Sequence, residues 1–387
     1  MNIIVAPDSF KGSLTAMEAA DAIVQGVRDV APDAEIVSVP LADGGEGTME
    51  ALVRATEGRI AGATVTGPMG EAVEAHYGVL GDDVTGVVEM AEAAGLSLVP
   101  AEKRDPRVAT TFGVGELMLA ALDAGCTQLI VGLGGSATND GGAGMAQALG
   151  ARLLGPDGKE LRRGGGALAE LARIDVSRLD PRIPRTTIYA ASDVTNPLCG
   201  PNGASAIYGP QKGADAQAVA ELDKALWHYG GVIAEQLGVE VREMAGAGAA
   251  GGLGAGLIAF AGAKVRSGAS LVLELLHFEE ALEAADLVLT GEGRIDGQIE
   301  FGKAISGVAL LAEKHGVPVV ALTGCLAEDD EKLAKRGVAA VMPITAGPIS
   351  EQEAMDRAGE LLQAAAERVM RLMLVGRRLG DGRWLGS

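Results

Sequence analysis

The chain has 387 residues, more than one typical hydrophobic core supports, so two domains are expected. Its 52 acidic and 32 basic residues give a net charge of -20, which disfavours nucleic acid and anionic membranes as partners over any large surface. Hydrophobic residues make up 48% and aromatic residues only 3%, and the 57 glycines suit helices and parallel strands that pack through small side chains.

Cysteine and histidine usage points away from several kinds of site. Three widely spaced cysteines, an odd number, favour a reducing compartment over a disulfide framework. The four histidines and the cysteines form no pairs at ligand spacing, so zinc or haem is not expected and any metal should be bound through oxygen. No targeting segment precedes the first strand, and the uncharged stretch 245–263 is too rich in Gly and Ala for a membrane span. We therefore expect a cytoplasmic protein that stays out of membranes.

Residues 1–55 alternate between strand, polar loop and helix, which is a βαβα start. The first helix is expected to begin near Ala16, because Thr15 and Glu18 have the spacing of a capping box. Its apolar residues recur at helical spacing and predict one buried face. They are Ala19, Ala20, Ile23, Val24 and Val27.

The pattern changes near Thr64, where short alternating segments separated by turns predict antiparallel strands. A helix over 110–124 and a strand over 187–191 follow, and βα alternation returns after about residue 278. The expected fold class is α/β, with a Rossmann-like doubly wound domain interrupted by an inserted second α/β domain that contains antiparallel strands. We expect the first domain over residues 1–63 plus 280–375, the second over 64–279, and a flexible tail over 376–387. The cleft between two such domains is the expected place for a small-molecule site.

A glycine-rich loop, Gly132–Gly144, follows an apolar strand and precedes a helix-like run. Glycines let the backbone approach a ligand closely, successive N–H groups form a concave nest, and a helix N-terminus favours negative charge. Ser136, Thr138, Asn139 and Asp140 add groups that can bind a sugar-like hydroxyl, a phosphate oxygen or a metal-bound water. The alternative is a polar turn with an N-cap, but so many glycines at a strand end favour an anion site.

Four further loops at predicted strand ends share this mixture of glycine, hydroxyl and charge. Ligands bind at the carboxyl ends of strands in α/β folds, so these loops are expected to converge. Any one of them taken singly could be an ordinary turn with a capping Asp. Their sequences are PDSFKGS (7–13), LADGGEGT (41–48), ASDVTNP (191–197) and LTGEGRID (289–296).

Charged side chains in these loops are the candidates for chemistry. Asp193 follows an apolar run and suits a base toward a hydroxyl or a magnesium ligand, with an Asx turn as the alternative. Glu292, Arg294 and Asp296 combine an anion-binding guanidinium with carboxylates able to hold a metal, and a solvated salt-bridge loop is their alternative.

Two lysines, Lys11 and Lys212, are set among turn residues rather than on a helical face. Such a position suits contact with a phosphate or a carboxylate, and surface solvation is the alternative for each.

Three better-known motifs are imitated without being complete. Gly132, Gly134 and Ala137 match a dinucleotide fingerprint, but the acidic residue expected about 20 residues later is missing. Residues 297–303, GQIEFGK, have the spacing of a P-loop up to its lysine, but an alanine replaces the required hydroxyl residue. Ser136 has neither the elbow motif nor a histidine partner of a serine nucleophile.

Taken together, the strand-end loops strongly resemble the type I glycerate kinase family of bacteria, nearly end to end. The resemblance implies ATP-dependent phosphorylation of D-glycerate, generally at the 2-hydroxyl to give 2-phosphoglycerate, by a Rossmann-like α/β domain with an inserted second domain. The basic tail after Val375 has no counterpart in the family. The motifs are APDSFKGSLTA (6–16), ADGGEGT (42–48), GLGGSATNDGGAGMAQALG (132–150), ASDVTNPLCGPNGASAIYGPQKGA (191–214), GAGAAGGLGAGL (246–257) and TGEGRIDGQIEFGK (290–303).

The resemblance and the residue chemistry together lead to a hypothesis of in-line transfer from ATP to glycerate, with Mg²⁺ neutralising charge. Asp193 is expected to be the base or hydroxyl orienter, and Asp43 could exchange roles with it. Lys11 and Arg294 are expected to hold the glycerate carboxylate or the transferring phosphoryl group. The expected metal ligands are Asp296 and Glu292, and the expected cofactor-binding residues are Gly134, Gly135, Ser136, Asn139, Asp43 and Lys212.

Several alternatives stay open at this point. The residues do not distinguish the 2-hydroxyl from the 3-hydroxyl, nor the loop that binds ATP from the loop that binds glycerate. An NAD-linked hydroxyacid dehydrogenase and a non-catalytic sensor of a phosphorylated metabolite are the rival functions. The expected partners are small molecules rather than nucleic acid or membrane, and a homo-oligomer is compatible with the pattern.

Overall fold

The structure is a computed structural model that describes residues 1–41, 44–295, 303–326, 333 and 335–380. The chain folds into two compact units, and each is described by itself. Unit 1 comprises Met1–Ala42 and Ala269–Ser387, and unit 2 comprises Asp43–Gly268. The second unit therefore interrupts the first along the chain.

Unit 1 contains a five-stranded parallel sheet in the order β13-β12-β11-β1-β2. Numbered within the sheet, this order is 2-1-3-4-5, one of the two common doubly wound arrangements. Its strands are β1 (Asn2–Pro7), β2 (Glu35–Ser38), β11 (Leu287–Ile295), β12 (Val319–Leu326) and β13 (Ala340–Pro343). Its helices are α1 (Ala16–Val30), α9 (Gly268–Leu275), α10 (Phe278–Leu282), α11 (Lys303–His315), α13 (Glu351–Asp356) and α14 (Ala358–Gly380).

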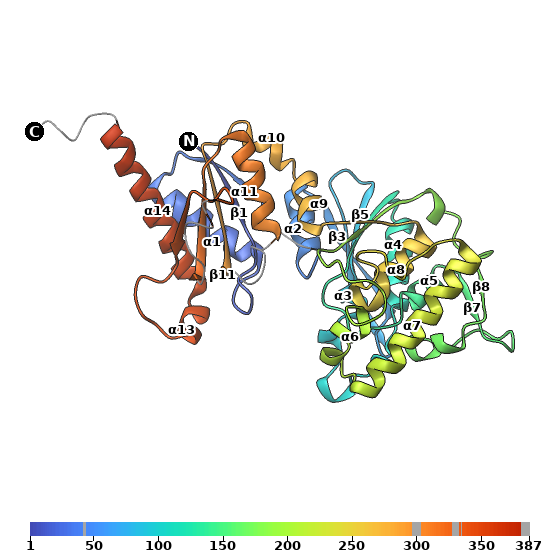
Figure 1. The fold of residues 1–387 in the computed structure, drawn as a ribbon. Coiled ribbons are helices and arrows are strands. Elements are labelled where there is room, and N and C mark those ends of the chain that lie inside the picture. The colour runs from blue at the N-terminus through green and yellow to red at the C-terminus, as the bar shows by residue number, and fades with distance from the viewer. Residues whose placement is uncertain (42–43, 296–302, 327–332, 334, 381–387) are drawn as a thin grey trace, which may run out of the picture. The chain divides into compact units, whose positions relative to one another are not determined.

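The interior strand β1 is buried on both faces, as a doubly wound sheet requires. Ile3 and Val5 join a cluster with α1 and α14, while Ile4 and Ala6 join a second cluster with α9, α10 and α11. Figure 1 shows α1 and α14 on one side of the sheet and α11 on the other. The carboxyl end of β1 lies beside Gly291 of β11, where the strand order reverses, and such a position is where ligands bind in doubly wound sheets.

The predicted capping box of α1 is confirmed. The Thr15 hydroxyl accepts a hydrogen bond from the amide of Glu18 at 3.2 Å, and the Glu18 carboxylate accepts one from the amide of Thr15 at 2.8 Å. The helix then buries Ala19, Ala20, Ile23 and Val27. Val24, also predicted for this face, is only partly buried.

Unit 2 contains a six-stranded mixed sheet in the order β10-β9-β6-β5-β4-β3. Strands β5, β6, β9 and β10 are parallel, and β3 and β4 add an antiparallel edge. The strands are β3 (Arg59–Thr66), β4 (Ala72–Val79), β5 (Thr85–Glu89), β6 (Gln128–Gly132), β9 (Thr187–Ala191) and β10 (Lys264–Arg266), and a separate two-stranded sheet pairs β7 (Arg152–Leu154) with β8 (Arg173–Asp175).

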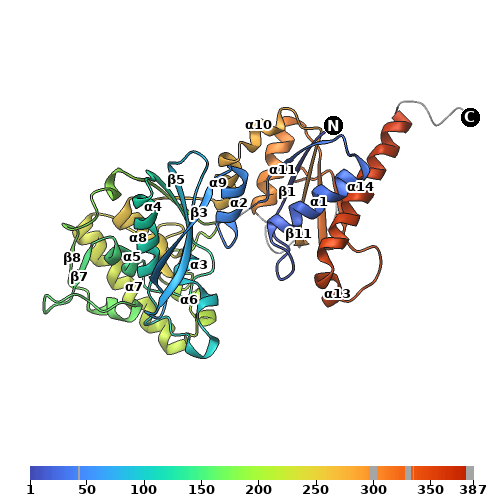
Figure 2. The ribbon, with the colours of Figure 1, turned by 180° about the vertical axis from the view of Figure 1, so that it is seen from behind.

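The helices of unit 2 cover both faces of this sheet. One core cluster joins the sheet to α3, α4 and α8, and a second joins α5 and α7 to the other side of α8. Helix α2 lies on the opposite face of the sheet, as the view in Figure 2 shows. The α-helices are α2 (Thr48–Ala55), α3 (Met90–Ala94), α4 (Phe112–Asp123), α5 (Ala143–Ala148), α6 (Ala204–Tyr208), α7 (Ala216–Leu237) and α8 (Ala249–Ala261). The 3-10 turns are η1 (Leu96–Leu98), η2 (Ala101–Lys103), η3 (Gly165–Glu170), η4 (Ile183–Arg185) and η5 (Pro210–Lys212).

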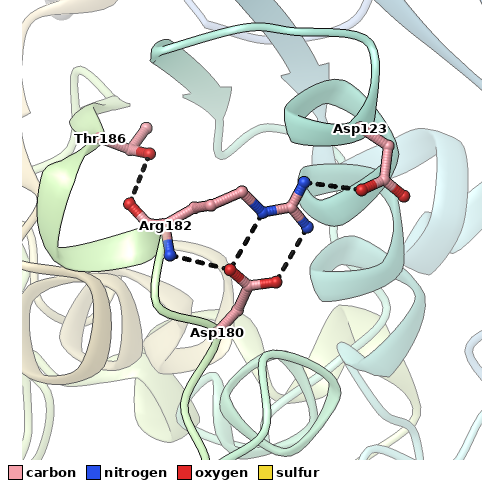
Figure 3. Close-up of polar contacts among 4 residues, drawn as sticks. All are labelled: Asp123, Asp180, Arg182 and Thr186. Carbon is pink, nitrogen blue, oxygen red and sulfur yellow. Dashed lines mark hydrogen bonds and ion pairs between the residues drawn. The ribbon is translucent and has the colours of Figure 1, made fainter.

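The segment that leads into β9 is tied to the end of α4 by a charged corner (Figure 3). The Arg182 guanidinium donates to both carboxylate oxygens of Asp180, at 3.0 and 2.8 Å, and to Asp123 at 2.6 Å. The Thr186 hydroxyl donates to the Arg182 carbonyl at 3.0 Å. Hydrogen bonds to these carboxylates raise the pKa of Arg182, and the same bonds join the segment before β9 to α4.

The observed unit borders differ from the expected ones. The border expected at 63/64 falls inside β3, which pairs with β4 along its whole length in unit 2. The border expected at 279/280 falls inside α10, which packs in the core of unit 1. The change in sequence periodicity marks a change from helix to strand, and this change does not coincide with a change of core. The tail was expected from 376, but α14 continues to Gly380, and residues 381–387 lie outside the described part of the chain.

Candidate functional site

The glycine-rich loop after β6 is almost entirely buried. Ser136 is 8% exposed, while Thr138, Asn139 and Asp140 are fully buried. Burial of so many polar groups requires hydrogen-bond partners, so the loop is best understood from the groups that contact it.

The loop that precedes α2 packs directly against the glycine-rich loop. The Gly134 amide donates to the Gly44 carbonyl at 3.2 Å. A Cβ at Gly132 would stand 2.6 Å from the Gly44 oxygen, and a Cβ at Gly134 would stand 2.6 Å from the Gly45 Cα. These two glycines are therefore needed for the approach of a second backbone segment, whereas the sequence pattern had suggested the approach of a ligand.

Glu89 holds that second segment in place. It ends β5 directly opposite Gly132 in the parallel register, and its carboxylate accepts hydrogen bonds from the amides of Gly47 at 3.3 Å and Met49 at 2.6 Å. Burial raises the pKa of Glu89 to about 7, with a smaller contribution from the Glu92 and Glu46 carboxylates, although the two amides oppose the shift. Sequence reasoning missed this residue, and its only signal was a carboxylate that directly ends the apolar strand TGVVE.

Asp140 organises the other side of the loop. Its carboxylate accepts hydrogen bonds from the Thr111 amide and hydroxyl at 2.8 and 2.9 Å, and from the amides of Gly142 and Gly144 at 3.1 and 3.2 Å. Complete burial raises its pKa against the opposing effect of these bonds. The carboxylate joins the start of α4 to the start of α5, which is a structural role.

A kink in α8 packs directly against the loop. Ala250, Gly251 and Gly252 have left-handed backbone conformations, and the Gly251 carbonyl accepts the Gly141 amide at 3.0 Å. A Cβ at Gly251 would stand 1.9 Å from the Thr138 carbonyl oxygen. The glycine-rich segment 246–257, which the sequence presented as a separate motif, therefore packs against the loop after β6.

Lys212 reaches the loop from η5. Its ammonium donates to the Ser136 hydroxyl and to the Thr138 carbonyl, both at 2.7 Å, and the residue is 1% exposed. Burial lowers its pKa to about 7, and the charge of Asp140 opposes this shift. Close by, the side-chain amide of Asn139 donates to the Ser205 hydroxyl at 2.9 Å. Within the described residues, the Thr138 hydroxyl and the Asn139 side-chain oxygen have no hydrogen-bond partner.

Asp193 lies at the same sheet edge as this loop. Strand β9 pairs in parallel with β6, so that Ala191 stands opposite Gly132, and Asp193 follows two residues later. Asp193 is half-buried. The turn after it is held by Asn196, whose side-chain oxygen accepts the Tyr208 hydroxyl at 2.8 Å and whose amide donates to the Asn202 carbonyl at 2.8 Å.

A second group of predicted residues gathers in unit 1. The Asp8 amide donates to the Gly291 carbonyl at 2.8 Å, so the loop after β1 runs beside the second half of β11. A Cβ at Gly293 would stand 3.5 Å from the Lys11 amide nitrogen. The Lys11 and Arg294 side chains are exposed and that of Glu292 is partly buried, so two cations and a carboxylate lie at the switch point of the doubly wound sheet.

The predicted site residues thus form two groups. Unit 2 brings together Gly134, Gly135, Ser136, Asn139, Lys212 and Asp193, and unit 1 brings together Lys11, Glu292 and Arg294. Asp43, Asp296 and most of the P-loop-like segment 297–303 lie outside the described residues.

None of the described helices combines the length and apolarity needed to cross a membrane. No group of three or more His, Cys, Asp or Glu side chains is arranged to hold a metal ion within the described ranges.

Comparison with known proteins covers nearly the whole chain. The model of the glycerate kinase family matches residues 3–374. The chain is 51% identical over 367 residues to a glycerate kinase of Halalkalibacterium halodurans (95% of this chain, 97% of the relative) and 50% identical over 378 residues to glycerate 2-kinase of Escherichia coli K12 (98% and 99%). A crystal structure from Salmonella typhimurium LT2, provisionally described as glycerate kinase 2, superposes with a TM-score of 0.89 at 48% identity over 98% of this chain and 99% of that one. The chain belongs to the glycerate kinase family.

Proposed function

We propose that this protein transfers the γ-phosphoryl group of ATP to the 2-hydroxyl of D-glycerate, giving 2-phosphoglycerate and ADP. The observation that carries the proposal is the 50% identity to the Escherichia coli relative named glycerate 2-kinase, over 98% of this chain and 99% of the relative. Both groups of polar residues at the carboxyl edges of the two sheets support it, since phosphoryl transfer needs cations, amide donors and one carboxylate near the acceptor hydroxyl.

Asp193 is the proposed base. The oxygen of the glycerate 2-hydroxyl forms a bond to the γ-phosphorus, the bond from that phosphorus to the bridging oxygen of ADP breaks, and the hydroxyl proton passes to the Asp193 carboxylate. Its partly buried position at the end of β9 suits this role. Asp43, the alternative base, lies outside the described residues.

Anion binding is assigned to backbone amides in unit 2 and to cations in unit 1. The Gly134 amide already donates to Gly44, so Gly134 contributes close packing. Among the described residues, no group accepts a hydrogen bond from the backbone amide of Gly135 or Ser136. This supports the proposal that both amides donate to a phosphate or carboxylate. Lys11 and Arg294, exposed at the switch point, are proposed to hold the second anionic group.

Mg²⁺ is proposed as the metal that accompanies ATP. Protein sites often bind Mg²⁺ through only one or two carboxylates together with substrate phosphates, so a three-ligand cluster is not required. Glu292, in the second half of β11, would supply such an oxygen ligand near the exposed cations Lys11 and Arg294. Asp296, the other proposed ligand, lies outside the described residues. The ion would neutralise charge on the transferring phosphoryl group.

A coupled assay of ADP release tests the reaction with D-glycerate, L-glycerate and related hydroxy acids. We expect turnover with D-glycerate that depends on Mg²⁺, and a phosphorus NMR spectrum of the product that shows phosphorylation at carbon 2. A product phosphorylated at carbon 3 would contradict the regiochemistry. Binding without ADP release would favour a sensor, and hydride transfer to NAD would favour a dehydrogenase.

The role of Asp193 is tested by Asp193→Asn. Loss of a general base lowers turnover by about 10² to 10⁴, so we expect a loss in this range with nucleotide affinity nearly unchanged. Asp157→Asn is the matched control, because Asp157 is an exposed loop aspartate of the same unit. Turnover of Asp193→Asn equal to that of the control would remove Asp193 from the role.

A further inference from the structure

Lys212 is a buried lysine whose side chain donates two hydrogen bonds to the glycine-rich loop. It comes at the end of η5, and its ammonium donates at 2.7 Å to both the Ser136 hydroxyl and the Thr138 carbonyl. At 1% exposed, it is among the largest fully buried side chains of the chain. A surface lysine would leave its ammonium in water, so this placement needs a different explanation.

Burial of an ammonium group is costly unless hydrogen bonds and an opposite charge compensate for it. Here the Ser136 and Thr138 oxygens accept its hydrogens, and Asp140, also fully buried, acts on it electrostatically. The lowered pKa of about 7 shows that burial outweighs this compensation. A neutral amine still has two N–H donors, so both hydrogen bonds survive in either protonation state.

The segment that carries Lys212 contacts the loop at an independent point. The Ser205 hydroxyl on α6 accepts a hydrogen bond from the side-chain amide of Asn139 at 2.9 Å. The segment from α6 through η5 therefore binds the loop at Ser136, Thr138 and Asn139. The lysine supplies two of these contacts and Ser205 supplies the third.

We infer that Lys212 is a positioning residue that fixes the shape of the Gly134–Asn139 loop and does not touch the substrate. Because the Lys212 ammonium binds the Ser136 hydroxyl and the Thr138 carbonyl, the backbone amides of Gly135 and Ser136 keep one orientation toward a bound anion. This inference deepens the proposed function and rests on it for its kinetic consequence, while its structural consequence stands without it.

Hydrogen–deuterium exchange on the full chain without substrate tests the structural consequence. Lys212→Met keeps the length of the side chain but removes both hydrogen bonds, and Lys224→Met is the control, an exposed lysine on α7. We expect exchange of the 133–140 amides to become at least about tenfold faster in Lys212→Met, with the strands of unit 2 unchanged and Lys224→Met equal to wild type. Unchanged exchange at 133–140, or acceleration spread evenly over unit 2, would overturn the inference.

Kinetics test the consequence for the reaction. Misplacement of a binding loop by about 1 Å can cost 10²-fold, so we expect kcat/KM of Lys212→Met to fall about 100-fold and Lys212→Arg, which retains the donors, to recover at least about tenfold. If Lys212 acts through Ser136, the double variant with Ser136→Ala should lose little more than Lys212→Met alone. Losses that multiply in the double variant, or wild-type kcat/KM in Lys212→Met, would overturn it.

A second variant, Ser136→Ala, tests the same inference independently of Lys212→Met. Ser136→Ala removes one of the two acceptors and leaves the lysine intact, so faster exchange at 133–140 is expected even if Lys212→Met does not fold; unchanged exchange in that variant would count against the inference. Failure of the proposed function is recognised separately, because it leaves the wild-type chain without ADP release from D-glycerate, whereas failure of the inference leaves an active wild type and unchanged exchange in the variants.

Discussion

The loop after β6 in unit 2 and the polar segments of unit 1, which are the loop after β1 and the second half of β11, resemble each other in sequence and differ in structure. Both regions combine glycines, hydroxyls and charges at the carboxyl ends of parallel strands. The loop after β6 buries Thr138, Asn139 and Asp140, whereas in unit 1 the loop after β1 exposes Lys11 and strand β11 exposes Arg294. The same composition therefore occurs in two environments, a buried loop whose polar groups are held by hydrogen bonds and a region with exposed cations.

The largest expected effect is on stability and concerns Asp140 in the buried loop after β6. Asp140→Ala leaves the Thr111 hydroxyl and the amides of Thr111, Gly142 and Gly144 without their acceptor. Each unsatisfied buried donor costs about 1–3 kcal/mol, so we expect the free energy of unfolding to fall by roughly 3 kcal/mol or more in urea titrations. Asp157→Ala, at an exposed loop position, serves as the control. A loss below about 1 kcal/mol would show that the loop does not depend on this carboxylate.

A pair of glycine substitutions compares the packing of the two regions. A Cβ at Gly134 would stand 2.6 Å from the Gly45 Cα, while a Cβ at Gly293 would stand 3.3 Å from the Phe10 Cα. Forced backbone shifts cost about 1–3 kcal/mol, so we expect Gly134→Ala to lower the free energy of unfolding by about 2 kcal/mol and Gly293→Ala by less. Equal losses in thermal unfolding of both variants would remove the proposed difference in packing.

Arg294→Gln tests the exposed side. Because the side chain is exposed, we expect its loss to leave the free energy of unfolding within about 0.5 kcal/mol of wild type. If the guanidinium holds an anionic group as proposed, its removal should lower kcat/KM by about tenfold or more, equal to about 1.4 kcal/mol. Arg336, another exposed arginine of unit 1, provides the control as Arg336→Gln. The two variants having the same kcat/KM would exclude Arg294 from the site.

The smallest expected effect concerns the pH dependence contributed by Glu89. The pKa of this carboxyl is raised from 4.5 to about 7 in the folded chain, with the Glu46 and Glu92 carboxylates and the amides of Gly47 and Met49 facing it. Its contribution to stability is therefore complete below about pH 4.5 and is lost as the pH rises through about 7. Glu89→Gln cannot titrate, so its free energy of unfolding relative to wild type should rise by at least about 1 kcal/mol between pH 5 and 8. A difference that stays constant with pH would contradict the raised pKa.

Local pattern was a good guide where the physics is local. The capping box placed the start of α1 correctly, because Thr15 and Glu18 satisfy each other within one turn. The alternation of strands and helices predicted two α/β units in which one interrupts the other. The polar strand ends predicted where charged residues gather, because parallel strands bring their carboxyl ends to one edge.

Local pattern failed where the decisive contact joins distant segments. The segment Gly44–Gly47 follows a strand of unit 1 in sequence, yet it packs on Gly132 and Gly134 in unit 2. Glu89 looked like an ordinary acidic residue at a strand end, and its raised pKa arises from burial against the start of α2. Neither the border near residue 42 nor the role of Glu89 is visible in a window of neighbouring residues.

The sequence by itself determined the fold class, the family and the set of loops that carry polar groups, because periodicity, caps and motif spacing are properties of neighbouring residues. Tertiary structure alone decided which of those groups are exposed. Lys11 and Lys212 occupy similar turns in the sequence, but Lys11 is exposed and Lys212 is 1% exposed, bonded to Ser136 and Thr138. The difference is physical, since burial and hydrogen bonding depend on residues 74 and 76 positions away along the chain.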